Sequence, residues 1–478
     1  MPSKHEIRVR YAPSPTGPFH IGGARTALFN WAFVRREGGA FILRIEDSDP
    51  ARSKKKYESE IIESLNWLGV LWDEGPGVSG KFGPYRQSER LAIYKKYLEK
   101  LLAEKKAYFC YCTKEELEAE RQSQLVEGFP PKYGGRCRNL TAPPPGKKPE
   151  VIRFKTPETN VFWTDMIRGK VSFDASLFGD FVIAKDIKSI PLYNFSVVID
   201  DHEMKISHVI RGEDHISNTP KQLLLISALE FETPHYAHLP LVLSADRKKL
   251  SKRFAETSVI EYRKMGYLPE AVVNFLMLLG WHPAGDREIF SPEEIIKVFD
   301  IKRAQKGGAI FNPEKLDWLN REHIKMAPLS ELQEIIAPIL AANEIKTSKE
   351  FLAKIIETER GRMKKISDFW PAASFFFNLP DYPADMLISK DDGRERTFEI
   401  MKKTLAVFEN LGRELLPETV SRALESLISE YGRSSVLWPL RVALSGLEAS
   451  PDPYDIIGVL GLEESINRVK TALEKLEK

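Results

Sequence analysis

A rigid turn near the beginning of the chain is the feature that most constrains its fold. The segment "APSPTGPFHIGG", residues 12–23, places His20 among three prolines and three glycines. Prolines hold such a turn in one shape, and glycines let a ligand approach the backbone. "HEIRVRYA" before it alternates as a strand does, and "ARTALFNWAFV" after it has helical spacing. His20 is therefore expected where a strand has ended and a helix begins, a position that attracts an anion, usually a phosphate.

Strand-like and helix-like segments continue to alternate after this turn. "AFILRIED" is typical of a second strand and "SKKKYESEIIESLNWLGV" of a helix, and such alternation predicts a parallel sheet. Residues 129–150, with six prolines and three glycines, indicate an insertion that interrupts this domain. Strands return with "ISHVIRGED" and "LPLVL", and a helix is expected to start at Thr219-Pro220 between them. From about Glu256 onward the pattern is helical.

The composition is typical of a soluble chain with several domains. Its 478 residues can fill several cores. The 70 Lys and Arg residues nearly balance the 68 Asp and Glu residues, so any basic surface must be local. We expect a cytoplasmic protein with no membrane partner, because no apolar stretch reaches membrane-spanning length and "MPSKHEIRVR" lacks the apolar core of a signal peptide. The three cysteines are too few for a disulfide framework.

A lysine-rich segment, "RKKLSKR" at residues 247–253, follows the expected strand "LPLVL" and precedes helical sequence. Taken alone, such a run is most often a solvated surface. Together with the turn that holds His20, it instead indicates a cationic loop that closes over the triphosphate of a nucleotide.

Two other patterns imitate ligand sites. "GPGVSGK", residues 75–81, resembles a P-loop up to its lysine, but Phe82 stands where Ser or Thr should hold magnesium, and we interpret it as a surface turn. His235 and His238 in "HYAH" have no acidic neighbours, and two histidines alone do not make a metal site.

Several segments together resemble a known family. "HIGG" and "KLSKR" resemble the "HIGH" and "KMSKS" signatures of class I aminoacyl-tRNA synthetases. Glutaminyl relatives have β-barrel anticodon-binding parts, whereas the C-terminal third of this chain is predicted to be helical. The fuller segments are similar to bacterial glutamyl-tRNA synthetases and occur in the right order: "APSPTGPFHIGGARTALFNW", "RIEDSD", "YRQSERLAIY", "VIRGEDHISNTPKQ", "KLSKR", "AIFNPEKLDWLNREHI" and "WPLRVALSG".

The resemblance implies an α/β fold class: a Rossmann-like parallel-sheet catalytic domain with an inserted α+β acceptor-binding domain, followed by all-α C-terminal domains. The expected segments are 1–87 and 191–255 for the two halves of the catalytic domain, 88–190 for the insertion, 256–325 for a helical stem-contact domain, and 326–478 for a helical anticodon-binding domain with a subdomain boundary near residue 378.

The resemblance also implies an enzyme that activates L-glutamate with ATP and Mg²⁺, releases pyrophosphate, and passes the glutamyl group to the 3′ terminal adenosine of tRNA(Glu), releasing AMP. The sequence leaves open whether tRNA(Gln) is a second substrate. A monomer is expected because no long coiled-coil seam is present. Two alternatives remain: another nucleotidyltransferase, which would not need the long helical part, and a non-catalytic RNA-binding relative, which should have lost His20 or Lys252.

One set of residues would bind ATP by this resemblance. A carboxylate must attack an α-phosphorus that negative oxygens surround, so catalysis is mainly placement and charge stabilisation. The histidine would hydrogen-bond the phosphates, the two glycines would admit the adenosine, and the lysines, with help from the serine, would neutralise the departing pyrophosphate. The implied residues are His20, Gly22, Gly23, Lys249, Ser251 and Lys252.

A second set would bind glutamate. By resemblance, two arginines and a tyrosine would hold the side-chain carboxylate, and Glu46 would face the amino group. Bidentate arginine contacts favour a carboxylate over an amide, which would exclude glutamine. The alternative for Glu46 is a solvated strand end. The implied residues are Arg10, Ala12, Ser14, Glu46, Tyr193 and Arg211.

The cysteines occur as Cys110, Cys112 and, after a gap, Cys137, inside the expected insertion. Some members of the family bind zinc there with this spacing and use a further tyrosine or histidine. Asn139 occupies the place where a histidine often stands, so Tyr133 would have to serve as the fourth ligand. Three thiolates in a loop-rich segment favour Zn²⁺, and three ordinary reduced cysteines are the alternative.

Overall fold

The computed structural model describes residues 6–248, 258–390, 392–411 and 417–477. The chain divides into two compact units, the first comprising Met1–Lys264 and Pro269–Lys315 and the second comprising Met265–Leu268 and Leu316–Lys478. The division falls within helix α10 (Pro313–Met326). Within the described ranges, no helix has both the length and the apolar character needed to cross a bilayer.

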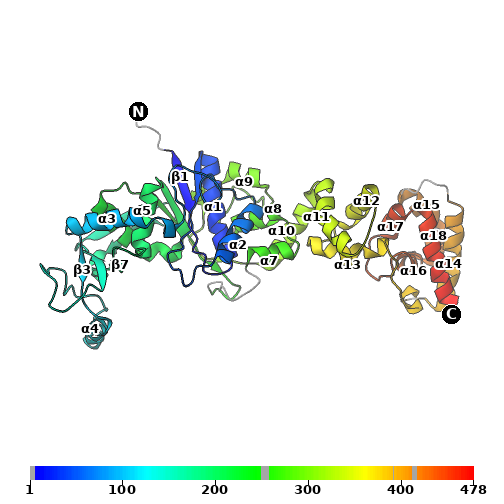
Figure 1. Cartoon of the computed structure of the whole chain (residues 1–478). Helices are drawn as coiled ribbons and strands as arrows, with labels where there is room; N and C mark the ends of the chain where they lie inside the picture. The colour runs from blue at the N-terminus through cyan, green and yellow to red at the C-terminus, as the bar shows by residue number, and fades with distance from the viewer. Residues whose placement is uncertain (1–5, 249–257, 391, 412–416, 478) are drawn as a thin grey trace. The chain divides into compact units, whose positions relative to one another are not determined.

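A six-stranded sheet organises the first unit. Its strand order is β2-β1-β8-β9-β5-β6, and every neighbouring pair is parallel except β5 and β6. Helix α1 packs beside β1 (Figure 1). The predicted parallel sheet is therefore confirmed. Its elements are β1 (Ile7–Tyr11), α1 (Ile21–Glu37), β2 (Gly39–Leu43), α2 (Lys55–Trp67), β5 (Asn160–Asp165), β6 (Gly169–Asp174), α5 (Tyr193–Glu203), β8 (His208–Gly212), α6 (Thr219–Leu229) and β9 (His235–Leu239).

Strand β1 differs from the half-exposed strand that its alternating sequence suggests. Arg8 and Arg10 are buried, as is Val9 between them. Each arginine is neutralised by a carboxylate: Arg8 pairs with Glu74 at 2.9 Å and Arg10 with Asp201 at 3.1 Å. A buried charge needs such a partner. The alternation therefore marks ion pairs on one face of a strand that is covered on both sides.

A smaller antiparallel sheet, in the order β3-β4-β7, forms within the segment predicted as an insertion. The hairpin β5-β6 comes from the same segment but extends the large sheet, because Asp165 pairs with Tyr236 of β9. The elements of this part are α3 (Leu91–Ala103), β3 (Ala107–Cys110), α4 (Lys114–Val126), β4 (Val151–Phe154) and β7 (Val182–Ala184).

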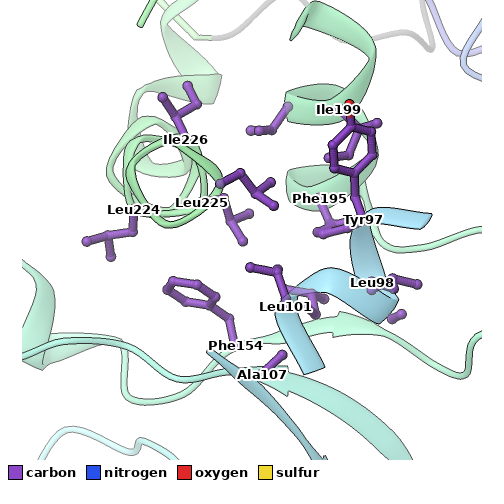
Figure 2. Packing of buried hydrophobic residues seen from close by; sticks show 14 of the residues in the cluster. Tyr97, Leu98, Leu101, Ala107, Phe154, Phe195, Ile199, Leu224, Leu225 and Ile226 are labelled. Carbon is purple, nitrogen blue, oxygen red and sulfur yellow. The ribbon is translucent and has the colours of Figure 1, made fainter. Parts of the chain in front are cut away.

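One hydrophobic cluster joins the small sheet to helices of the large one. Full burial of such side chains contributes about 1.5–3 kcal/mol each. The cluster anchors α5 and α6, whose first residues are Tyr193 and Thr219. Figure 2 shows the side chains of α3, α5, α6 and β4 that meet there, with Ala107 of β3: Tyr97, Leu98, Leu101, Phe154, Phe195, Ile199, Leu224, Leu225 and Ile226.

The strand expected over "LPLVL" is displaced in the structure. The buried strand β9 is "HYAHL", and after Pro240 only the two residues of β10 (Val242–Leu243) are extended. Proline lacks an N–H for the ladder and ends the first strand. Strand β10 instead pairs with β11 (Ala309–Ile310). The first unit also contains α7 (Val259–Lys264), α8 (Pro269–Leu278) and α9 (Pro292–Val298).

The regular elements among the described residues of the second unit are all helices, which confirms the predicted all-α C-terminal part. The buried side chain of Arg468 ties helices of this unit together, because its Nη1 donates to the carbonyl oxygens of Phe375 at 2.9 Å and Leu444 at 2.6 Å. Besides the rest of α10, its helices are α11 (Leu329–Ala342), α12 (Lys349–Glu359), α13 (Phe369–Ala373), α14 (Arg394–Glu409), α15 (Pro417–Tyr431), α16 (Arg433–Ser445), α17 (Pro453–Leu460) and α18 (Leu462–Glu477).

Candidate active site

A cavity of about 570 Å³ lies in the first unit, at the carboxyl ends of the parallel strands. Small-molecule sites commonly have volumes of about 300–1,000 Å³. Segments that follow β1, β2, β8 and β9 form its walls. Nine residues predicted to bind ATP or glutamate line it: Arg10, Ala12, Ser14, His20, Gly22, Gly23, Glu46, Tyr193 and Arg211.

The topology of the sheet explains why the cavity is there. Strand β1 has β2 on one side and β8, which the chain reaches much later, on the other. Where the strand order reverses in this way, the segments leaving the carboxyl ends diverge and leave a crevice for a ligand. Lys249, Ser251 and Lys252 lie outside the described residues, so their part in the site remains a prediction.

His20 is the N-cap of α1, which confirms its expected place between a strand and a helix. Its backbone is extended, and its Nδ1 accepts a hydrogen bond from the Gly23 N–H at 3.2 Å. Because Nδ1 accepts this bond, a neutral imidazole carries its proton on Nε2, which can then act as a donor. The first turn of α1 adds backbone N–H groups and the positive end of the helix dipole.

The two glycines after His20 also have packing roles that the sequence did not reveal. A Cβ on Gly23 would lie 2.6 Å from the hydroxyl oxygen of Tyr11, and a Cβ on Gly22 would lie 3.1 Å from Nδ1 of His20. The glycines therefore let α1 begin close to β1 and leave space for the imidazole.

A buried charge network holds Arg10 and Glu46 on one wall of the cavity. Arg10 Nε donates to Oδ1 of Asp201 at 3.1 Å, and Arg44 Nη1 donates to the same oxygen at 2.7 Å. Arg44 Nη2 reaches Oε1 of Glu46 at 3.2 Å. Arg44 is fully buried, and Arg10 and Glu46 are nearly so. The network therefore fixes a guanidinium and a carboxyl group side by side.

Burial and the two arginines set the protonation of these carboxyl groups. Burial raises the pKa of Glu46 above its ordinary value, although Arg44 and Arg10 oppose the shift. Burial acts upward on Asp201 too, but there the two arginines prevail and hold its pKa below its ordinary value. A further cation beside Glu46 would favour its ionised form.

Arg211, near the end of β8, lines another wall together with Tyr193. Its Nη1 lies 3.5 Å from the Tyr193 hydroxyl, which is itself 3.0 Å from Nδ1 of His215. Burial lowers the pKa of His215 to about 4, so its imidazole is neutral near pH 7. The cavity thus presents the guanidinium groups of Arg10 and Arg211 together with the carboxyl group of Glu46.

Sequence analysis missed the residues that hold these groups in place. Arg44 stands in the quoted segment "RIEDSD" but was given no role there, and Asp201 lies inside helix α5, outside every quoted motif. The statement that the histidines of "HYAH" lack acidic neighbours was wrong for His238. Its Nδ1 lies 2.6 Å from Oδ2 of Asp165, and both side chains are fully buried. Only the pairing of β5 with β9 brings Asp165 there.

The three cysteines of the insertion meet in one buried cluster, their sulfur atoms within 4.8 Å of one another. Sγ of Cys112 is 3.7 Å from Sγ of Cys137 and 3.7 Å from the Tyr133 hydroxyl. Tetrahedral zinc, with sulfur ligands at about 2.3 Å, holds them about 3.8 Å apart. Burial raises the pKa of the Cys112 thiol to about 12, a cost that a bound cation would remove. Asn139 is exposed, and its Oδ1 lies 3.5 Å from Nζ of Lys155, away from the sulfur atoms. The three cysteines therefore fit a zinc ion with Tyr133 as the fourth ligand.

Comparison with known families assigns both parts of the chain. Residues 6–318 match the family described as tRNA synthetases class I (E and Q), catalytic domain. Residues 329–473 match the anticodon binding domain.

Individual relatives match over nearly the whole chain. A glutamate–tRNA ligase 1 of Caldicellulosiruptor saccharolyticus is 46% identical, over 97% of this chain and 98% of its own. A glutamate–tRNA ligase of Heliobacterium modesticaldum is 45% identical, over 98% of this chain and 97% of its own. A crystal structure of a glutamate tRNA ligase from Elizabethkingia meningosepticum in complex with its amino acid superposes with a TM-score of 0.88, at 35% identity, and covers 99% of this chain and 100% of that one. These matches confirm the resemblance inferred from the motifs.

Proposed function

Because this chain belongs to the class I glutamate–tRNA ligases, we propose that it joins L-glutamate to the 3′ terminal adenosine of tRNA(Glu) in two steps. In the first step, the α-carboxylate of glutamate attacks the α-phosphorus of ATP, which is bound as its magnesium complex, and pyrophosphate leaves. In the second step, a ribose hydroxyl of the terminal adenosine attacks the carbonyl carbon of the glutamyl-adenylate, and AMP leaves.

The observation that carries this proposal is the meeting of Arg10, Arg211 and Glu46 in one cavity that His20 also lines. The guanidinium groups match the side-chain carboxylate of glutamate, and Glu46 matches its ammonium group. His20 and the first turn of α1 match the phosphates of ATP. A carboxylate can accept hydrogen bonds from both arginines, whereas an amide offers a single acceptor oxygen, so the site favours glutamate over glutamine.

The residues act on the first step through position and charge. The arginines and Glu46 hold glutamate at both ends, which leaves its α-carboxylate as the group that attacks. His20 Nε2 donates to phosphate oxygens as negative charge builds in the transition state. Lys249 and Lys252, with Ser251, neutralise the pyrophosphate as it leaves.

Aminoacylation assays with glutamate and with glutamine, each on purified tRNA(Glu) and tRNA(Gln), test the proposal. We expect glutamate to be attached to tRNA(Glu). Glutamate on tRNA(Gln) as well would identify a non-discriminating enzyme. Absence of charging on both tRNAs, with ATP consumed on another acceptor, would favour the nucleotidyltransferase alternative and overturn the proposal.

We expect Lys252→Ala to lower the rate of glutamate-dependent pyrophosphate exchange by about 10²–10³-fold, because one donor to the developing charge is lost. Lys248→Ala is the matched control from the same lysine run. Lys248 is exposed and pairs with Asp246 at 3.2 Å, so its removal should leave the exchange near the wild-type rate. Equal rates in the two variants would show that Lys252 has another role.

Glutamate binding should weaken as the pH falls through the pKa of Glu46. The ammonium group of glutamate needs the ionised carboxylate. An ordinary Glu side chain has a pKa of about 4.3. The pKa of Glu46 is raised, so its carboxylate becomes protonated at a higher pH than that. The KM for glutamate in pyrophosphate exchange should therefore rise toward acid pH. In Glu46→Gln this KM should be high at every pH, and a wild-type KM that does not change with pH would contradict the assignment.

We also propose that Cys110, Cys112, Cys137 and Tyr133 bind one zinc ion. Zinc bound there would tie the loop between β3 and β4 to the small sheet and supply no chemistry to the cavity. Elemental analysis of the purified protein should find about one equivalent of zinc, and Cys112→Ser should lower that content. A wild-type protein with only a small fraction of an equivalent would remove the idea.

The remaining parts of the proposal come from the sequence. They are the five-segment domain division, a monomeric state and a cytoplasmic location. The described cysteines are all free thiols, which supports a reducing compartment.

A further inference from the structure

Three neighbouring strands carry a line of buried polar side chains that ends at Arg211. The parallel pairing of β8 with β9 places Arg211 opposite His238, and β5, on the other side of β9, ends at Asp165. Asp165, His238 and Arg211 are 2%, 0% and 5% exposed. The line therefore leads from the interior of the sheet to the cavity, where Arg211 is the member on the wall.

The hydrogen bonds along this line fix the tautomer of His238. Oδ2 of Asp165 lies 2.6 Å from Nδ1 of His238, and Oδ1 accepts from the N–H groups of Ile167 and Arg168 at 3.0 and 2.9 Å. Burial lowers the pKa of His238, although the bond to Asp165 opposes the shift, so the ring is neutral. Because a carboxylate only accepts, Nδ1 carries the proton and Nε2 keeps its lone pair.

Two groups lie within hydrogen-bond distance of that lone pair: the hydroxyl of Thr219, whose Oγ1 is 3.1 Å from Nε2, and the guanidinium of Arg211, which can only donate. Nε of Arg211 lies 3.2 Å from Nε2 of His238, so its N–H can donate to the ring. Two further contacts fix the guanidinium plane: Nη2 donates to Oγ1 of Thr219 at 2.8 Å, and the ring of Tyr236 lies 5.5 Å from the guanidinium carbon. Nη1 lies on the side of the guanidinium that faces Tyr193, which also lines the cavity.

We propose that His238, in the tautomer set by Asp165, is a positioning residue for Arg211. It fixes the direction in which the guanidinium presents its Nη1 edge to the substrate, and so contributes to the choice of a carboxylate over an amide. This inference rests on the role of Arg211 in glutamate binding that is proposed above.

Asp165→Asn tests the inference with little change of shape. The backbone N–H groups of Ile167 and Arg168 hold the amide oxygen in place of Oδ1, so the amide NH₂ replaces Oδ2 and donates to Nδ1 of His238. The ring proton must then move to Nε2, where it meets the N–H of Arg211 at 3.2 Å. The Thr219 hydroxyl oxygen, 3.1 Å from Nε2, can accept that proton, but Nε of Arg211 has lost its acceptor and faces a donor instead, so Arg211 must turn away.

We expect Asp165→Asn to raise the KM for glutamate in pyrophosphate exchange by about 10- to 100-fold, the effect of one buried donor left unpaired. The KM for ATP and kcat at saturating glutamate should stay within about twofold, because the phosphate side of the cavity is untouched. The preference for glutamate over glutamine should fall. A merely structural role would lower the melting temperature without separating the two KM values.

Asp180→Asn is the matched control. Asp180 is equally buried and accepts a backbone N–H, from Thr156 at 2.8 Å, but it lies in the small sheet region and does not line the cavity. Its substitution should leave the KM for glutamate unchanged.

A second substitution separates tautomer from packing. In His238→Gln, the side-chain oxygen can accept from Arg211 whatever Asp165 does, so the KM for glutamate should stay closer to wild type than in His238→Leu. When His238→Gln is already present, adding Asp165→Asn should no longer raise the KM for glutamate. If Asp165→Asn does not fold, the comparison of His238→Gln with His238→Leu decides, and equal KM values overturn the inference.

The same assays keep the two proposals apart. An unchanged KM for glutamate in folded Asp165→Asn, with a large increase in Arg211→Ala, overturns the positioning role alone. An unchanged KM in both variants removes the proposed role of Arg211 in glutamate binding as well.

Discussion

Replacing Arg211 by alanine should raise the KM for glutamate in pyrophosphate exchange by about 30-fold or more, because loss of one partner of a buried charged pair costs about 2–5 kcal/mol. The KM for ATP should stay near its wild-type value, since the proposed phosphate site is at His20 and the start of α1. Arg211→Lys should not restore binding. A lysine has no planar fork and no Nε to donate to His238 while also contacting the substrate.

The control for this variant is Arg8→Ala. Arg8 is 4% exposed, also lies on a strand of the large sheet, and forms an ion pair with Glu74, but it does not line the cavity. Its removal should lower the melting temperature without a change in the KM for glutamate. If Arg211→Ala binds glutamate as the wild type does, the side-chain carboxylate must be held elsewhere.

The second large effect is expected at His20. His20→Asn should lower kcat for glutamate activation by about 10²–10³-fold, because the Nε2 donor to the developing phosphate charge is lost and the shorter amide does not reach its place. Asparagine is a favourable N-cap, so the start of α1 should remain intact. The measurement is pyrophosphate exchange at saturating ATP and glutamate.

His20→Ala separates catalysis from capping. It should lose the same factor in kcat and, in addition, about 1 kcal/mol of stability, because the Gly23 N–H loses its side-chain partner. Thermal unfolding of the two variants measures this difference. A kcat close to wild type in His20→Asn would mean that the imidazole has only its capping role.

Much of the fold could be predicted because local patterns agree with it. The turn around His20, the strand before it and the helix after it follow from residues close in sequence. The pattern failed at β9, where two histidines hid a buried strand and Pro240 ended it early. No local rule shows that a histidine on such a strand is hydrogen-bonded to an aspartate on another strand.

The site was predictable in part for the same reason. Arg10 and Arg211 could be named because the resemblance to the family implied them, and both line the cavity. The residues that orient them could not. Asp201 and Asp165 reach the site only through helix packing and strand pairing, and nothing in "RIEDSD" shows that Arg44 contacts both Glu46 and Asp201. Their signal is a buried charge that needs a partner, which only three-dimensional neighbours reveal.

The cluster shown in Figure 2 also limits how far this chain can be shortened. Helices α5 and α6, which begin at Tyr193 and Thr219, bury apolar side chains against the inserted sheet. A shortened chain with the large sheet alone would therefore expose an apolar surface on both helices. The insertion therefore supports the helix whose first residue, Tyr193, lines the cavity. The insertion and the cavity would have to be inherited or exchanged together.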